Sequence, residues 1–155
     1  MSDVYICNMS GLPDRVERAI KVAVLRTWLR FKLKFPETFW IIIDDIREPG
    51  VAGRYTYPLD VIYLSGKYIL DCDYDPAIKA VAIVAHEVTH KAQRSRSDNP
   101  LTEIHADPTE FHDGSWWEEE AEQVSIDVTH EIFPCVESAT RGSNGKVYYP
   151  RQEVN

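Results

Sequence analysis

The chain has 155 residues, 44% of them hydrophobic, which fits a single domain over residues 1–155 with a core of its own. A net charge of −8 disfavours nucleic acid as a partner, and no apolar run reaches the roughly 18 residues of a membrane span. Three scattered cysteines, and an N-terminus without a basic cluster before an apolar stretch, indicate reduced thiols and no signal peptide. We therefore expect a cytoplasmic protein that binds neither nucleic acid nor membranes.

The first half of the chain predicts one helix and then short strands. Apolar residues recur near the helical period over residues 13–34, and Asp14 with Glu17 resembles a capping box at the start of this helix. Residues 39–43 are rich in β-branched side chains and predict a buried strand. Residues 54–57 and 60–65 predict a hairpin, and we expect the second of these strands to form a free edge of the sheet.

The second half predicts two further helices. Residues 76–93 are apolar nearly all round, which is typical of a buried helix, and the acidic residues 71–76 indicate a solvated turn before it rather than a calcium loop. Residues 116–132 return to helical composition. The polar residues 95–115 between these helices are long for a structureless connection, which favours a functional loop or lid, and we expect a flexible tail from about residue 140. Short strands between helical stretches predict an α+β fold.

The sequence of residues 86–90, HEVTH, is an HExxH motif. Residues four apart lie on one face of a helix, so His86 and His90 can bind the same metal ion. Glu87 is rotated by about 100° from His86, which leaves it outside the ligand set and able to take a proton from water. The alternative is a pair of hydrogen-bonded core histidines, but two histidines and a carboxylate in a buried helix are costly without partners.

Two glutamates in the last predicted helix could complete a metal site. Glu118 and Glu122 are one helical turn apart, so the first can bind the metal while the second holds a ligand histidine from behind. The alternative is a solvated acidic helix start that is stabilised by the helix dipole. Following an HExxH motif, the ligand interpretation is favoured.

Together, HEVTH and the EEEAE segment at residues 118–122 resemble the gluzincin metallopeptidases. Among these they look most like the small cytoplasmic ImmA/IrrE-type proteins, which phages and mobile elements often encode. The resemblance covers residues 54–128 and implies one zinc ion per chain, bound by His86, His90 and Glu118, with Glu87 as the base. It also implies a zincin-like minimal metallopeptidase fold, with an N-terminal helix, a small and mostly antiparallel sheet, the HExxH helix and a C-terminal ligand helix. Glu122 stands where the family usually has Asp or Asn, and no helix-turn-helix module is evident.

A second resemblance competes with the first. Residues 111–116, FHDGSW, look like the His-Gly segment of SprT-like zinc proteins, which are associated with DNA. In that family a histidine is the third ligand, and the residue at this position is His112.

These observations predict a zinc-dependent hydrolase that cleaves peptide bonds in a peptide or protein substrate, with Glu87 as the general base. The alternatives are a non-catalytic zinc-binding regulatory or interaction protein and a SprT-like protein. The sequence does not rank the side chains that could stabilise an oxyanion, which are Tyr148, Tyr149, His112 and Arg54.

Overall fold

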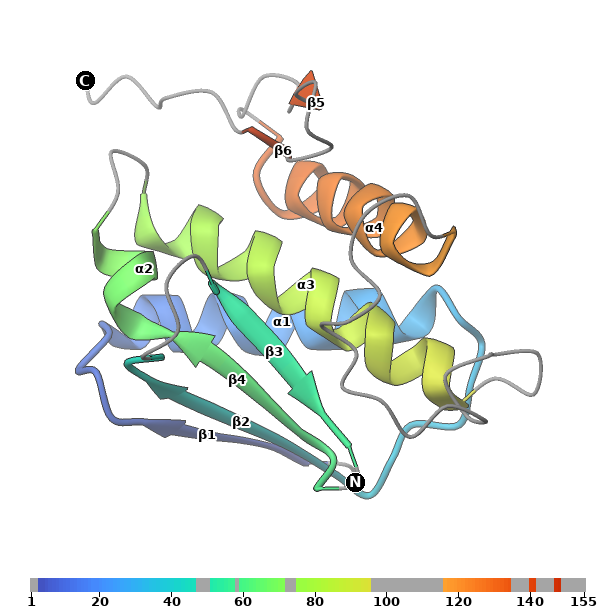
Figure 1. The fold of residues 1–155 in the computed structure, drawn as a ribbon, viewed down its shortest axis with the longest axis horizontal. Coiled ribbons are helices and arrows are strands. Elements are labelled where there is room, and N and C mark those ends of the chain that lie inside the picture. The colour runs from blue at the N-terminus through green and yellow to red at the C-terminus, as the bar shows by residue number, and fades with distance from the viewer. Residues whose placement is uncertain are drawn as a thin grey trace.

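A computed structural model describes residues 3–46, 51–57, 59–71, 75–95, 116–134, 140–141 and 147–148. These residues form an α+β fold with four helices, a four-stranded mixed sheet and a separate pair of two-residue strands (Figure 1). Most of the predicted loop at residues 95–115 and most of the predicted flexible tail lie outside the described residues.

The four-stranded sheet contains β1 (Asp3–Asn8), β2 (Thr38–Asp44), β3 (Gly53–Thr56) and β4 (Val61–Ser65), in the order β1-β2-β4-β3. The β1–β2 and β2–β4 pairs are parallel, and only the β3–β4 hairpin is antiparallel. The prediction of a mostly antiparallel sheet is therefore wrong, because β1 precedes the first helix and a helical crossover returns the chain parallel to it. The prediction that residues 60–65 form a free edge is also wrong, since β4 lies between β2 and β3.

The helices are α1 (Asp14–Leu29), α2 (Gly66–Leu70), α3 (Pro76–Ser95) and α4 (Trp116–Ile132). The first element of the chain is thus a strand and not the predicted N-terminal helix. The predicted capping box is wrong, because Pro13 occupies the N-cap of α1 and no side chain caps it. Most of the turn predicted before α3 lies outside the described residues, but Asp75 is at the start of the helix, where its Oδ1 accepts a hydrogen bond of 2.9 Å from the Ala77 N–H.

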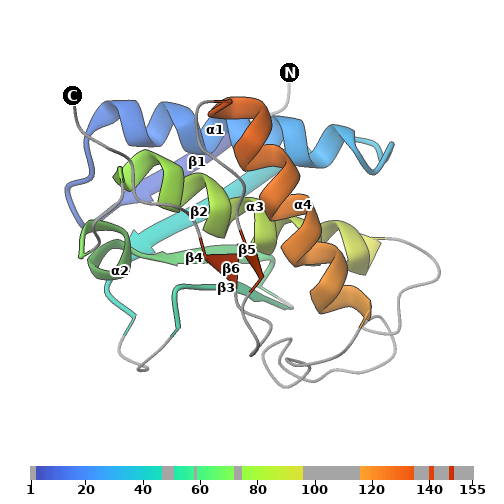
Figure 2. The ribbon, with the colours of Figure 1, turned by 90° about the horizontal axis from the view of Figure 1, so that it is seen from above.

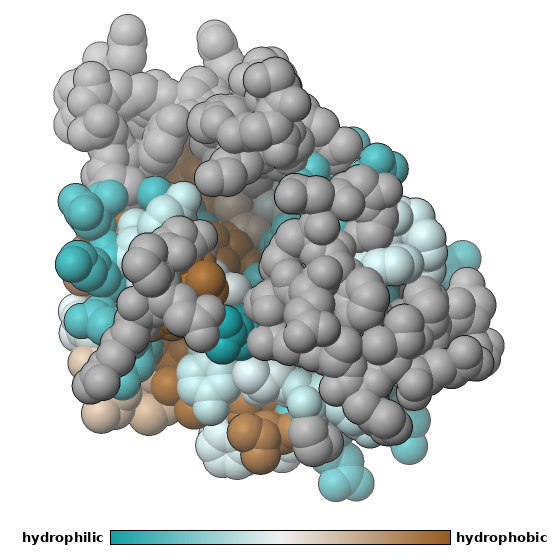
Figure 3. Space-filling view, in the orientation of Figure 1, coloured by the Kyte–Doolittle hydropathy of each residue, from teal (hydrophilic) through white to brown (hydrophobic). Residues whose placement is uncertain are grey.

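The helices cover one face of the sheet in two layers. Helices α1 and α3 lie on the sheet, and α4 runs across both of them (Figures 1 and 2). Helix α3 is central in the fold because it contacts α1, α2, α4, β3 and β4. These contacts explain why its own side chains are apolar on nearly every side. One hydrophobic core joins side chains from α1 to α4 and from β2 to β4. On the face shown in Figure 3, hydrophobic residues occupy several separate areas between hydrophilic ones.

Two arginines of α1 and the arginine at its C-cap form ion pairs with acidic residues elsewhere in the chain. Arg30 forms ion pairs with Asp127 and Glu131 of α4, and Arg15 lies 2.8 Å from Asp75. These exposed pairs each contribute little free energy, but they balance part of the positive charge of α1. None of the helices in the described part of the chain combines the length and the apolar character that a membrane span requires.

The outer strands of the sheet are β1 and β3. On the face of the sheet that points away from α1 and α3, the rings of Tyr5 and Trp40 stack with their centroids 4.8 Å apart, and both side chains are exposed. In the C-terminal part of the chain, β5 (Thr140–Arg141) and β6 (Val147–Tyr148) pair in antiparallel fashion.

Candidate metal centre

Helix α3 supplies both histidines of the HExxH motif. His86 is half-buried and His90 is buried, and the two Nε2 atoms lie 3.2 Å apart on one face of the helix. The helix can bury this face because small or apolar residues surround the histidines and pack against the neighbouring elements, among them Ala82, Ala85 and Val88. The predicted geometry of two imidazoles on one helical face is thus present.

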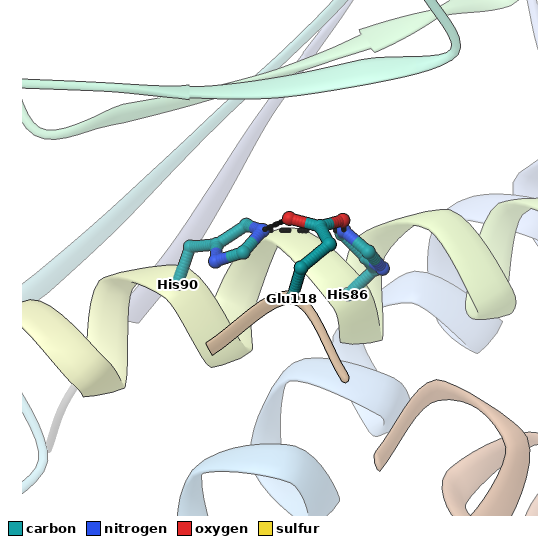
Figure 4. A group of neighbouring side chains, drawn as sticks. All are labelled: His86, His90 and Glu118. Atoms are coloured by element: carbon teal, nitrogen blue, oxygen red, sulfur yellow. Dashed lines mark hydrogen bonds and ion pairs between the residues drawn. The ribbon is translucent and has the colours of Figure 1, made fainter. Parts of the chain in front are cut away.

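Helix α4 brings Glu118 to the same point. Its Oε1 atom lies 2.7 Å from His86 Nε2, and its Oε2 atom lies 3.3 Å from His90 Nε2. Figure 4 shows the carboxylate reaching from α4 to both imidazoles of α3. A hydrogen bond of 2.7 Å from Ser125 Oγ to the Ala82 carbonyl also joins the two helices one to two turns away. The position of Glu118 therefore depends on the packing between α3 and α4.

The other ring nitrogen of His90 is held by Gln93. His90 Nδ1 lies 2.9 Å from Gln93 Oε1, while Gln93 Nε2 donates a 2.7 Å hydrogen bond to the Trp117 carbonyl. Because a carbonyl can only accept, this bond assigns the amide orientation and leaves Gln93 Oε1 to accept from His90. The Nδ1 atom of His90 therefore carries the proton, and in the neutral ring the Nε2 lone pair faces His86 and Glu118.

The electrostatics of this group favour a positive charge. Burial lowers the pKa of His90, but the hydrogen bond to Glu118 and the negative charges of Glu87 and Glu118 outweigh burial and raise that pKa to about 9. The carboxylate therefore stabilises a proton on the imidazole, and a metal cation would compete for the same nitrogen.

His86, His90 and Glu118 fit a metal ion. One ligand atom from each residue lies within 4.8 Å of the other two, and all three residues are buried or half-buried. Two imidazole nitrogens and a carboxylate oxygen suit zinc and several other divalent transition metals, so the donor set alone leaves the metal undetermined. Within the described residues the group has three members, which leaves room for a fourth ligand from solvent or substrate.

Glu87 lies beside this group and faces the edge strand β3. The residue is only 8% exposed, and among the described residues its carboxylate has no hydrogen-bond or ion-pair partner. A Cβ atom added to Gly53 of β3 would lie 3.2 Å from Glu87 Cγ, so strand and helix are close at this point. A carboxylate that none of the described residues engages, and that lies beside a group able to hold a metal cation, is able to accept a proton from water.

The β3–β4 hairpin is also tied to α3 one turn beyond Glu87. The buried Lys91 ammonium lies 2.6 Å from Asp60 Oδ2, and Asp60 Oδ1 accepts a 2.7 Å hydrogen bond from the Tyr55 hydroxyl. This network fixes the distance between the edge strand and the HExxH helix.

The predicted site residues are only partly brought together. His86, His90 and Glu118 converge, and Glu87 lies beside them, whereas His112 and Tyr149 lie outside the described residues. Glu122 is half-buried on α4, and its support of a ligand histidine stays a prediction, since the partner of His90 Nδ1 is Gln93.

This arrangement does not identify which side chain would stabilise an oxyanion. Gly53 faces α3, so the alternation of side chains along β3 directs Arg54 to the opposite face of the sheet, away from Glu87. The backbone of Tyr148 forms part of β6.

Gln93 is the residue that the sequence did not single out. The sequence feature that could have pointed to Gln93 is its spacing from His90, because a residue three positions later lies on the same face of the helix. Its partners on α4 become evident only from the packing of the two helices.

No family model, curated protein or solved structure matches this chain. The resemblance to gluzincins thus stays a prediction, and the function is argued from the residues themselves.

Proposed function

We propose that the protein is a zinc-dependent metallopeptidase in which His86, His90 and Glu118 hold the metal and Glu87 is the general base. The observation that carries the proposal is the position of Glu87, a largely buried residue whose carboxylate has no protein partner among the described residues, beside a group that could hold a metal. A structural zinc site would have no use for a base at this point and would be expected to have four protein ligands.

The donor set and the open position support a catalytic zinc site over a structural one. When bound, zinc supplies the Lewis acidity that activates water and polarises a carbonyl group. His86, His90 and Glu118 would hold it with two neutral ligands and one negative ligand, which keeps the net charge of the site positive. Gln93 keeps the Nε2 lone pair of His90 directed at this group.

The remaining chemistry is assigned to this chain's own residues. Glu87 accepts a proton from the attacking water and delivers it to the leaving amine, which general acid–base catalysis requires. Strand β3 is an edge of the sheet close to Glu87, so its main-chain groups can pair with an extended peptide whatever its sequence. This arrangement favours a peptide or an unfolded segment of a protein as the substrate.

The proposal is tested by combining metal analysis with a cleavage assay on a library of quenched fluorescent peptides. The wild-type protein should bind about one zinc ion per chain, and His86→Ala combined with His90→Ala should abolish this binding. Glu87→Gln should keep the zinc and lose cleavage, because an amide cannot take a proton at neutral pH.

Glu119→Gln is the matched control, since Glu119 is an exposed glutamate of α4 and should leave both zinc binding and cleavage unchanged. Full zinc occupancy in the double histidine variant would refute the metal site. Undiminished cleavage by Glu87→Gln would refute the base, and a zinc-loaded wild-type protein that cleaves none of the peptides would refute the peptidase activity.

A further inference from the structure

Gln93 contacts both halves of the metal group. It lies on α3 three residues after His90, is completely buried, and accepts a hydrogen bond from the Nδ1 atom of His90. Its amide nitrogen donates to the Trp117 carbonyl at 2.7 Å and to Glu120 Oε1 at 3.0 Å. Trp117 and Glu120 flank Glu118 on α4, so one side chain connects a ligand histidine to the segment that carries the ligand glutamate.

The amide group suits this position better than other polar groups of similar size. An amide has one accepting and one donating end, and here the accepting end faces an imidazole N–H while the donating end faces two acceptors. A carboxylate at the same place could accept from the imidazole, but it could not donate to the Trp117 carbonyl. An apolar side chain could do neither and would leave His90 Nδ1, the Trp117 carbonyl and Glu120 Oε1 without this partner.

We propose that Gln93 is a positioning residue that orients His90 and couples the position of Glu118 to it. The inference rests on the proposed zinc site and extends the ligand-bearing motif to HExxHxxQ. Gln93 fixes the tautomer in which the Nε2 atom of His90 is the ligand, and it holds the first turn of α4 so that the Glu118 carboxylate meets both imidazoles. Partners of this kind hold a ligand ring in place, and their loss typically lowers metal affinity by about 10–100-fold.

A purely structural role for Gln93 makes a different prediction. If Gln93 only filled space between α3 and α4, Gln93→Leu would be tolerated at least as well as Gln93→Glu, because leucine brings no charge into the interior. If Gln93 positions His90, the order is reversed, since only the glutamate retains an acceptor for the Nδ1 proton.

The experiment measures zinc affinity by competition with a chromophoric chelator, using the full chain. Gln93→Leu should bind zinc about 10–100-fold more weakly than the wild-type protein, and Gln93→Glu should lie between the two. Gln123→Leu is the matched control, because it makes the same change at an exposed glutamine of α4 whose amide, within the described part of the chain, bonds only Asp127, and it should leave the affinity unchanged. Unchanged affinity in Gln93→Leu, or weaker binding by Gln93→Glu than by Gln93→Leu, would overturn the proposal.

A second measurement needs no variant, which covers the case that Gln93→Leu does not fold. In a long-range ¹H–¹⁵N spectrum of the zinc-loaded wild-type protein, His90 should bind zinc through Nε2 and carry a slowly exchanging proton on Nδ1. Coordination through Nδ1 would overturn the proposal. If the wild-type protein binds no zinc, the proposed function fails and this inference fails with it. Zinc binding that is indifferent to Gln93 rejects the positioning role alone.

Discussion

The close contact between β3 and α3 makes Gly53→Ala a sensitive test of the site's architecture. The added Cβ atom would lie 2.6 Å from Ile83 Cγ2, whereas ordinary van der Waals contacts are 3.4–4 Å. The overlap of about 1 Å is hard to relieve, because Ile83 is β-branched and has one strongly preferred rotamer in a helix. Strain of this kind costs about 1–3 kcal/mol, and the gain from replacing glycine in a strand offsets about 0.5–1 kcal/mol.

We therefore expect Gly53→Ala to lower the free energy of unfolding by about 1 kcal/mol, and by at most about 2.5 kcal/mol, in urea denaturation followed by circular dichroism. Zinc content should not change, since the atoms nearest to the added Cβ belong to Ile83, Glu87 and Tyr63 and not to the three proposed metal ligands. The matched control is the variant Ile83→Ala, which lacks the Cγ2 atom. In this variant, Gly53→Ala should leave the free energy of unfolding nearly unchanged. An equal loss of stability in both backgrounds would show that the contact between Gly53 and Ile83 is not the cause, and the reasoning would be wrong.

Two further predictions concern the metal group. In chelator competition, Glu118→Ala should weaken zinc binding far more than His112→Ala, and the opposite ranking would replace the gluzincin-like ligand set with the SprT-like one. In the metal-free protein, burial lowers the pKa of His90, but the hydrogen bond to Glu118 and nearby negative charge raise it from 6.5 to about 9. The stability that the protonated ring contributes is then complete below pH 6.5 and is lost as the pH rises through 9. Thermal unfolding of the metal-free protein across this range measures the effect, and a melting temperature that rises with pH would contradict it.

Local patterns predicted α3, α4 and the hairpin well, whereas α1 ends five residues before the predicted end at residue 34 and α2 was not predicted. Helix α4 begins and ends at the predicted residues, and α3 extends only two residues beyond the predicted end at residue 93. The residues of β2 were found within one position at each end. In each case the signal is periodicity or β-branched composition within the element itself, which needs no knowledge of distant residues.

Pairing between distant strands left no such local signal. Strand β1 alternates exposed and half-buried residues over six positions at the start of the chain, and its parallel pairing with β2 depends on the crossover through α1. The candidate site also depends on contacts between distant residues. The spacing of His86 and His90 lies within one helix and can be read from the sequence, but the role of Gln93 depends on which residues of α4 lie opposite it. Glu118 was predicted from its place in a motif, and its convergence with the histidines depends on tertiary packing.

The outer position of β1 has a consequence for behaviour at high concentration. Among the described residues no strand pairs with its outer side, so a row of main-chain donors and acceptors is open to a strand of another molecule. The exposed rings of Tyr5 and Trp40 add apolar area next to this row. The net charge of −8 keeps molecules apart through mutual repulsion, and added salt screens that repulsion. The colloidal stability of the folded protein therefore depends on the balance between attraction at an open strand edge such as β1 and repulsion by the overall charge.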